Sequence, residues 1–148
     1  MTIKGRIRAI SVSAEKGTKK TNVSEAELKT DFGIVGDAHA GTLHRQVSLL
    51  AIESIQAIAA MGKSVSAGDF AENITTEGLD LRELRVGSKI KLGKTAEIEV
   101  AQFGKKCHNR CTIFNELGQC IMPREGIFAT VTKSGKIRVG DIIEAVHD

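Results

Sequence analysis

The feature that most limits the fold of this 148-residue chain is a series of short strand-like stretches separated by glycine turns. Apolar and polar residues alternate in these stretches, as they do in β-strands that bury one face. Ser134-Gly135 lies between two of them and favours a tight hairpin turn. The stretches are residues 6–13, 89–92, 97–100, 126–133, 136–139 and 142–146. They predict a mainly β fold, a closed or partly open β-barrel with a few short helices.

One segment has the periodicity of a helix instead. Between residues 48 and 61 the apolar side chains form a wide face, Ser48 fits the N-cap, and Gly62 fits the position just past the end. We therefore expect one main helix at about residues 48–61. Residues 15–31 are polar, and they predict a loop with a short helical turn around residues 24–28.

Composition and charge exclude several classes of protein. The formal charge of +3 is mild, which favours small anionic ligands over nucleic acid, and five Phe without Tyr or Trp leave few platforms for stacked bases. No stretch approaches the roughly 18 apolar residues of a membrane span, and no secretory apolar region follows the N-terminus. The odd set of three cysteines favours reduced thiols, so we expect a cytoplasmic protein. Without a visible linker, residues 1–148 are expected to form a single domain.

The first candidate site is a glycine-rich stretch, residues 36–46 (GDAHAGTLHRQ), which we call the glycine loop. Its backbone amides and the following helix predict a site for an anion. Arg45 is suited to bind a phosphate or carboxylate through two hydrogen bonds. The ligand-binding candidates in this loop are Asp37, His39, Gly41, His44 and Arg45. A capped helix start, in which these side chains only satisfy the loop backbone, is an equally weighted alternative.

The second candidate is residues 68–76 (GDFAENITT). Glu72 and Asn73 are candidates to orient a polar ligand or to support the glycine loop. Judged by chemistry alone, an ordinary turn is the favoured interpretation of this stretch.

The third candidate is residues 105–111 (KKCHNRC), where thiols lie among cations. Positive charge from Lys105 and Lys106 stabilises a thiolate at Cys107 and makes it a nucleophile, a persulfide carrier or a ligand for a soft metal. Arg124 follows within a few residues of the last cysteine and adds a further cation.

Two other interpretations of the cysteines stay open. One is a structural zinc site, because Cys107, Cys111 and Cys120 form a C-x3-C-x8-C pattern with His108 as a fourth ligand. That spacing lacks the paired C-x2-C of common zinc folds. The other is inert buried thiols, which suits Cys111 or Cys120 better than Cys107.

Taken together, the chain resembles the MOSC domain, a family named for the C-terminus of molybdenum-cofactor sulfurases, in its short stand-alone form. The resemblance implies a β-barrel with a few helices and a cleft for the molybdenum–pterin cofactor or a related anionic ligand. It also implies that Cys107 is the reactive cysteine, which in larger relatives ligates molybdenum or is proposed to carry sulfur from a pyridoxal-phosphate-dependent cysteine desulfurase. The matching stretches are residues 33–50 (GIVGDAHAGTLHRQVSLL), 68–81 (GDFAENITTEGLDL), 86–93 (VGSKIKLG) and 122–142 (MPREGIFATVTKSGKIRVGDI).

The resemblance and the residues lead to one preferred function. We expect the protein to bind a molybdenum–pterin or similar anionic ligand and to carry or transfer sulfur on Cys107, which is also the candidate metal ligand. A cysteine desulfurase and proteins of molybdenum cofactor biosynthesis are the expected partners. No desulfurase domain and no pyridoxal-phosphate lysine site are present, so no bound pyridoxal phosphate is expected in this chain itself.

Two alternatives remain. One is a non-catalytic cofactor-binding or docking module. The other is a molybdenum-dependent reductase of N-hydroxylated compounds, which ranks last because Lys105 and Lys106 stand where redox-active relatives have aromatic and proline residues.

Overall fold

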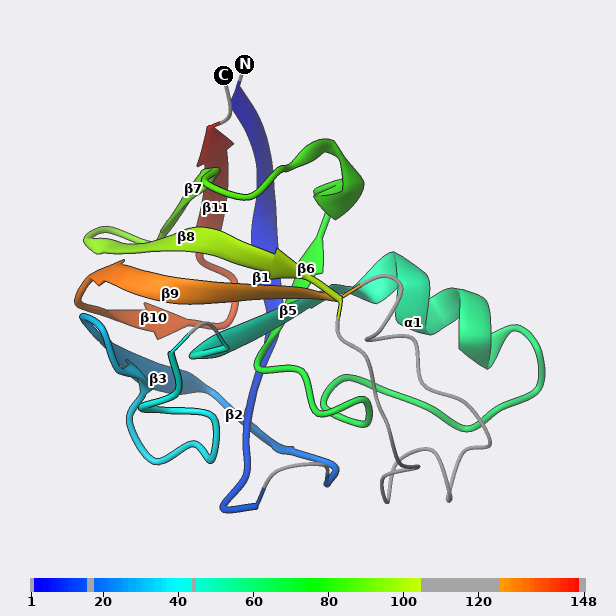
Figure 1. Ribbon diagram of the computed structural model, residues 1–148. Helices are drawn as coiled ribbons and strands as arrows, with labels where there is room; N and C mark the ends of the chain where they lie inside the picture. Colours follow the sequence, from blue (N-terminus) through cyan, green and yellow to red (C-terminus); the bar gives the residue numbers. More distant parts are fainter. Residues whose placement is uncertain (1, 16–17, 44, 105–125, 147–148) are drawn as a thin grey trace.

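Seven strands close a barrel in the computed structural model, which describes residues 2–15, 18–43, 45–104 and 126–146 (Figure 1). All neighbouring strands are antiparallel except β5 and β6, which are parallel. The prediction of a mainly β fold built on a closed barrel is confirmed. In order around the barrel, the strands are β1 (Thr2–Val12), β6 (Ile74–Glu77), β5 (Val47–Ala51), β9 (Ile127–Lys133), β8 (Ala96–Phe103), β7 (Lys89–Leu92) and β11 (Ile142–Val146).

A short strand and a second sheet extend the barrel. Strand β2 (Thr21–Val23) pairs with the far end of β1, and a three-stranded sheet contains β10 (Gly135–Arg138), β3 (Glu25–Lys29) and β4 (Gly33–Ile34). The prediction of a loop with a helical turn for residues 15–31 is therefore wrong. Leu28 is fully buried, and its strand pairs with β10 more than a hundred residues later. The strand alternates polar and apolar residues (EAELK), but Glu, Ala and Lys are types depleted in strands, which hid it.

The main helix, α1 (Ile52–Ala59), is shorter than predicted. Its predicted start at Ser48 is wrong, because residues 47–51 form strand β5. Both Leu49 and Leu50 are fully buried, and such a continuous apolar run fits a buried strand and a helix equally well. The helix also ends earlier than the predicted residue 61, at Ala59, and Gly62, with a φ of 90°, lies two residues after the C-cap Ala60. No helix in the described ranges is long and apolar enough to cross a membrane.

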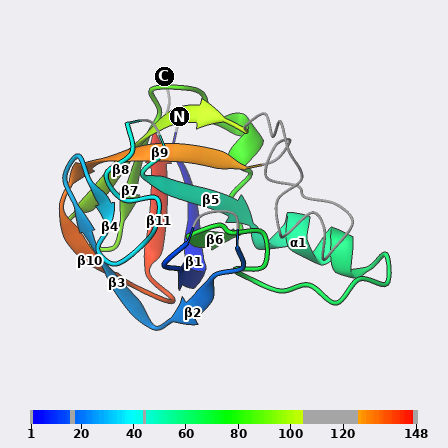
Figure 2. The ribbon, with the colours of Figure 1, turned by 60° about the horizontal axis from the view of Figure 1, so that its bottom comes forward.

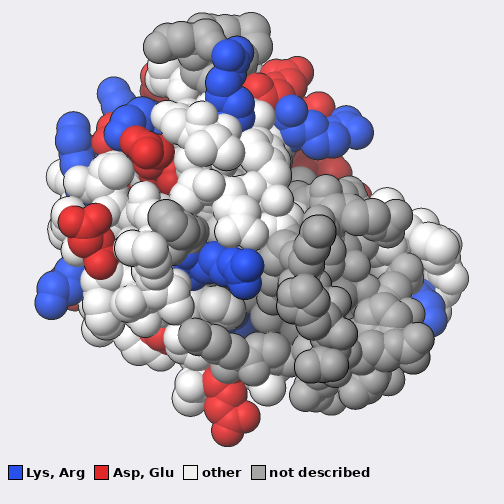
Figure 3. Space-filling view, viewed as in Figure 1, with Lys and Arg blue, Asp and Glu red and all other residues white. Residues whose placement is uncertain are grey.

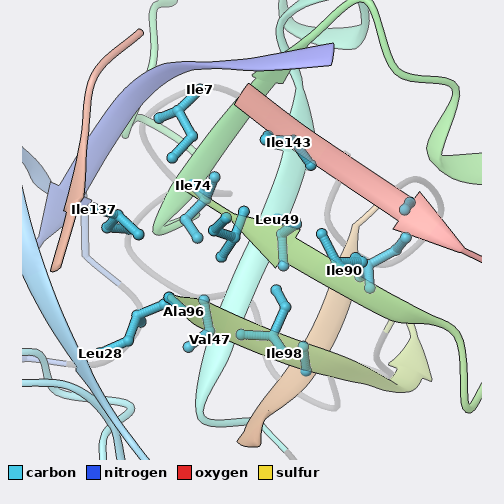
Figure 4. Packing of buried hydrophobic residues seen from close by; sticks show 14 of the residues in the cluster. Ile7, Leu28, Val47, Leu49, Ile74, Ile90, Ala96, Ile98, Ile137 and Ile143 are labelled. Carbon is cyan, nitrogen blue, oxygen red and sulfur yellow. The ribbon is translucent and has the colours of Figure 1, made fainter. Parts of the chain in front are cut away.

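Strand β5 lies between two hydrophobic cores because its side chains alternate between two faces. Leu49 belongs to the core inside the barrel, where Figure 4 shows it near Ile74. Leu50 belongs to a second core on the outside of the barrel, with Phe70 and Phe128. The remaining described members of the second core are Ile52, Ile55, Ile58 and Ala71. Burial of each large apolar side chain contributes about 1.5–3 kcal/mol.

The helix and the small sheet lie on opposite sides of the barrel. Figures 1 and 2 both show α1 projecting from one side and β3 and β10 covering the other. A single 3₁₀ turn in the described chain, η1 (Leu81–Glu83), follows β6, and the side chain of Asp80 accepts a hydrogen bond from the backbone N–H of Arg82 at its start. The fold thus leaves the glycine loop between β4 and β5, at the junction of the small sheet and the barrel.

Candidate functional site

The glycine loop is anchored by the carboxylate of Asp37. Its Oδ1 accepts hydrogen bonds from the Nζ of Lys20 at 2.8 Å and from the backbone N of Ser13 at 3.1 Å, and its Oδ2 accepts one from the backbone N of His39 at 3.0 Å. The side chains of Asp37 and Lys20 are both fully buried. Burial by itself would raise the pKa of Asp37, but the hydrogen bonds from Lys20 and from the backbone N–H of His39, together with the ammonium charge, outweigh it and hold the pKa well below its ordinary value.

Lys20 is a site residue that the sequence did not predict. Besides Asp37, its Nζ lies 3.0 Å from the Oγ of Ser13 and 3.2 Å from the Nδ1 of His39. Its backbone N donates to the carbonyl oxygen of Gly68, which joins the glycine loop to the second candidate stretch. No local pattern distinguishes Lys20, because its neighbour Lys19 has the same chemistry and is exposed.

His39 and Gly41 are fixed within the loop. The imidazole of His39 is 9% exposed, and its Nδ1 lies 3.5 Å from the Oδ2 of Asp37. The backbone N of Gly41 donates to the carbonyl oxygen of Phe32 at 2.7 Å, and its φ of 85° is one that residues with a Cβ rarely adopt. The amide of Gly41 is therefore already used inside the protein, while part of the His39 ring reaches the surface.

Glu72 is completely buried and supports the turn that contains it. Its Oε2 accepts hydrogen bonds from the backbone N of Gly68 and the Oγ1 of Thr75, both at 2.9 Å, and its Oε1 accepts one from the backbone N of Phe70 at 3.2 Å. Burial raises the pKa of Glu72 above its ordinary value, although these hydrogen bonds oppose the rise. This side chain therefore joins residues 68–70, in the loop that follows α1, to Thr75 on strand β6.

Asn73 joins three strands of the barrel. Its Oδ1 accepts hydrogen bonds from the backbone N of Ser48 at 2.9 Å and from the Oγ of Ser48 at 3.2 Å. Its Nδ2 donates to the carbonyl oxygen of Ser11 at 3.1 Å. Glu72 and Asn73 thus make contacts that support the frame around the glycine loop, one of the two roles expected of them; a ligand-orienting role for either stays a prediction.

Arg45 differs from these residues because it is exposed. Its guanidinium carbon lies 5.7 Å from the centroid of the Phe128 ring, and its Nε donates to the Oε1 of Gln102 at 3.4 Å. Gln102 and Phe128 are paired residues on β8 and β9. The guanidinium therefore rests on a rigid part of the barrel's outer face and keeps Nη groups for which no described residue is an acceptor.

Gln102 also connects Arg45 to the position where strand β8 ends. Its Nε2 donates to the carbonyl oxygen of Gly104 at 2.8 Å, and the backbone N of Gly104 donates to the carbonyl oxygen of Gly126 at 2.7 Å. Gly104 and Gly126 flank residues 105–125, the part of the sequence that contains Cys107. Gln102 could not be predicted from the sequence, because its role depends on the pairing of β8 with β9.

The other predicted site residues are outside the described ranges. They are His44, Lys105, Lys106, Cys107 and Arg124, and the same holds for Cys111 and Cys120. Within the described ranges, no group of three or more His, Cys, Asp or Glu side chains is arranged to hold a metal ion. The roles of Cys107 as catalytic residue and metal ligand stay predictions.

Two surface features lie apart from these residues. A cavity of about 460 Å³ lies between α1 and η1 and is lined by residues such as Glu53, Leu79 and Asp80. It contains none of the predicted site residues. On the face drawn in Figure 3, acidic and basic side chains of the described residues are interspersed.

Comparison with known proteins gives a family match and several structural neighbours. The family model of the MOSC domain matches residues 36–144. No curated protein matches the sequence significantly. The crystal structure of the YUAD protein from Bacillus subtilis is similar, with a TM-score of 0.80 and 20% identity over 98% of this chain and 97% of that one. The crystal structures of two YiiM proteins are also similar, each with 21% sequence identity to this chain. The one from Geobacillus stearothermophilus has a TM-score of 0.72 and covers 97% of this chain and 75% of its own. The one from Escherichia coli has a TM-score of 0.68 and covers 97% of this chain and 70% of its own.

Proposed function

The chain belongs to the MOSC domain family, and from that premise we propose that it binds a molybdenum–pterin or similar anionic ligand beside Arg45 and carries sulfur on Cys107. The family is associated with the molybdenum cofactor. The family match begins at residue 36, so it includes the whole glycine loop. Arg45 would thus bind the anionic part of the ligand, and Cys107 would carry the sulfur.

The observation that carries the proposal is the setting of Arg45. The exposed guanidinium contacts Phe128 and Gln102, and its two Nη groups have no acceptor among the described residues, which suits a phosphate or another oxyanion. Asp37 and Glu72 are occupied by donors from their own chain, so we assign them to the frame of the site. Of the described candidates, Arg45 fits an anionic cofactor best.

The link from Arg45 to the cysteine is made through Gln102. Gln102 binds both Arg45 and Gly104, and Cys107 follows Gly104 by three residues in the sequence. When bound, the cofactor would supply a molybdenum centre that accepts soft sulfur ligands such as a thiolate. Lys105, Lys106 and Arg124 would keep Cys107 in the thiolate form.

The sulfur step needs no external oxidant or reductant. The thiolate of Cys107 attacks the terminal sulfur of a persulfide on a cysteine desulfurase. A new S–S bond forms as the S–S bond of the donor breaks, and the donor cysteine leaves as a thiolate. The product is a persulfide on Cys107, from which the outer sulfur passes to an acceptor in the same way.

Intact mass spectrometry tests the proposed function. Reduced protein is incubated with a cysteine desulfurase and cysteine, and wild type is compared with Cys107→Ala and with Cys111→Ala as a matched control. A gain of one sulfur atom that dithiothreitol reverses is expected in wild type and Cys111→Ala, and its loss is expected in Cys107→Ala. Absence of the gain in folded, reduced wild type would leave the non-catalytic cofactor-binding module as the better function.

A further inference from the structure

The buried ammonium group of Lys20 limits the chemistry of the residues around it. Its side chain is 0% exposed, and its Nζ lies 2.8 Å from Asp37 Oδ1, 3.0 Å from Ser13 Oγ and 3.2 Å from His39 Nδ1. A buried ammonium is tolerated only where it is paired and hydrogen-bonded. The ammonium therefore favours a lone pair over a hydrogen at each of these three atoms.

For His39 this preference selects one form of the imidazole. An ammonium has only donors, so we assign the Nδ1 of His39 as the acceptor, without a hydrogen. The ring is then neutral, with its hydrogen on Nε2. The Oδ2 of Asp37 lies 3.5 Å from the same Nδ1 and would favour a hydrogen there. The imidazole could carry its hydrogen on Nδ1, facing Asp37, or on Nε2, and the contact with Lys20 favours Nε2.

The opposite edge of the His39 ring is available for binding. No described residue accepts a hydrogen bond from Nε2, and the side chain is 9% exposed. His39 belongs to the same glycine loop as Arg45, and Thr42 holds the carbonyl of His39 through its Oγ1 at 2.8 Å. The loop therefore contains an imidazole and, six residues later, an exposed guanidinium.

We infer that Lys20 is a positioning residue: it holds His39 as the neutral form with hydrogen on Nε2, and this N–H donates to the same anionic ligand that Arg45 binds. The statement about the ligand rests on the proposed function. The statement about the imidazole rests only on the contacts of Lys20, so each can fail without the other.

The state of the imidazole is measured by long-range ¹H–¹⁵N correlation spectra of histidine-labelled protein at pH 7.5. His39→Gln identifies the signals of His39. Wild type is expected to carry hydrogen on Nε2 alone, and a hydrogen on Nδ1 in wild type would overturn the inference. Lys20→Met is expected to move hydrogen to Nδ1, facing Asp37, and a Lys20→Met protein with the wild-type pattern would also overturn it.

The double variant Lys20→Met/Asp37→Asn serves as the matched control. It leaves no unpaired buried charge, so it shows whether the fold tolerates the loss of the pair. If the Lys20→Met protein alone is unfolded by circular dichroism, wild type still decides the question, because hydrogen on Nδ1 in wild type contradicts the inference.

Titration with inorganic pyrophosphate separates the two statements. The Nε2 signal of His39 is expected to shift as pyrophosphate binds, and Arg45→Ala is expected to weaken the binding about tenfold. If Arg45→Ala weakens binding but the His39 signal does not respond, the ligand contact of His39 is wrong and the proposed anion site stands. If pyrophosphate binds Arg45→Ala as tightly as wild type, the proposed anion site is wrong while the role of Lys20 is judged by the imidazole alone.

Discussion

Replacement of Asn73 by alanine tests whether this residue holds the barrel together. The side chain continues the pairing of β5 and β6 by one step, since its Oδ1 accepts from the backbone N of Ser48 just before the parallel pair Leu49–Ile74. Its Nδ2 binds the carbonyl oxygen of Ser11 on β1. Asn73→Ala leaves both backbone groups without their partner inside the protein. At about 1–3 kcal/mol for each buried group, the expected loss of unfolding free energy is about 3 kcal/mol.

Thermal and urea unfolding followed by circular dichroism measure this loss, because a chain without Trp or Tyr gives little intrinsic fluorescence. For a domain of this size about 3 kcal/mol corresponds to a fall of roughly 6–12 °C in Tm. Asn22→Ala is the matched control, since Asn22 is exposed and accepts one hydrogen bond from the Oγ of Ser11. The control is expected to lose less than about 1 kcal/mol. If Asn73→Ala lost no more than Asn22→Ala, the framework role of Asn73 would be refuted.

Three further predictions concern buried polar groups. The hydroxyl of Thr76 is buried and has no hydrogen-bond partner among the described residues, so Thr76→Val should raise the unfolding free energy by about 1 kcal/mol. Thr75→Val loses a hydrogen bond to Glu72 and should lower the unfolding free energy. Equal effects of the two substitutions in urea unfolding would contradict this. Asp37→Asn breaks the buried pair with Lys20 and should cost about 3–5 kcal/mol, and a loss below about 1 kcal/mol would show that the pair is not buried in solution. Because burial raises the pKa of Glu72 in the folded protein above 4.5, the folded state binds more protons there than the unfolded one, so this residue should make stability fall as pH rises from about 4.5 through the raised pKa. The difference in unfolding free energy between wild type and Glu72→Gln, measured across that range, should change with pH, and a constant difference would contradict the buried setting.

The barrel could be predicted largely where strands alternate. Residues 89–92 and 142–146 were predicted with the bounds that the structure has, because a polar face outside and an apolar face inside leave a clear period of two. Strand β5 was mistaken for the start of a helix because both of its faces are buried, Leu49 in the barrel and Leu50 against the second core. Strand β3 was missed although it alternates, because Glu, Ala and Lys favour helices and turns over strands.

The candidate site could be predicted only as a set of residue types. The glycine loop and its Arg45 were found from their composition, but the supports of Arg45 come from the paired strands β8 and β9. Asp37 and His39 were predicted as ligand residues, whereas the contacts that hold them come from Lys20, which lies 17 residues before Asp37 in a stretch without a distinctive pattern. Such contacts depend on the three-dimensional packing and leave no mark on the local sequence.

The most direct test of the proposed site is the affinity of the protein for inorganic pyrophosphate, measured by isothermal titration calorimetry at fixed salt. Gln102→Glu places a carboxylate beside the guanidinium of Arg45, so it should weaken binding about tenfold without removing Arg45. Lys94→Ala is the control, because Lys94 is an exposed cation in the turn between β7 and β8, at the other end of β8 from Gln102. Weakened binding in Gln102→Glu with wild-type affinity in Lys94→Ala is the predicted result. Equal affinities in all three proteins, or no binding by folded wild type, would contradict an anion site at Arg45.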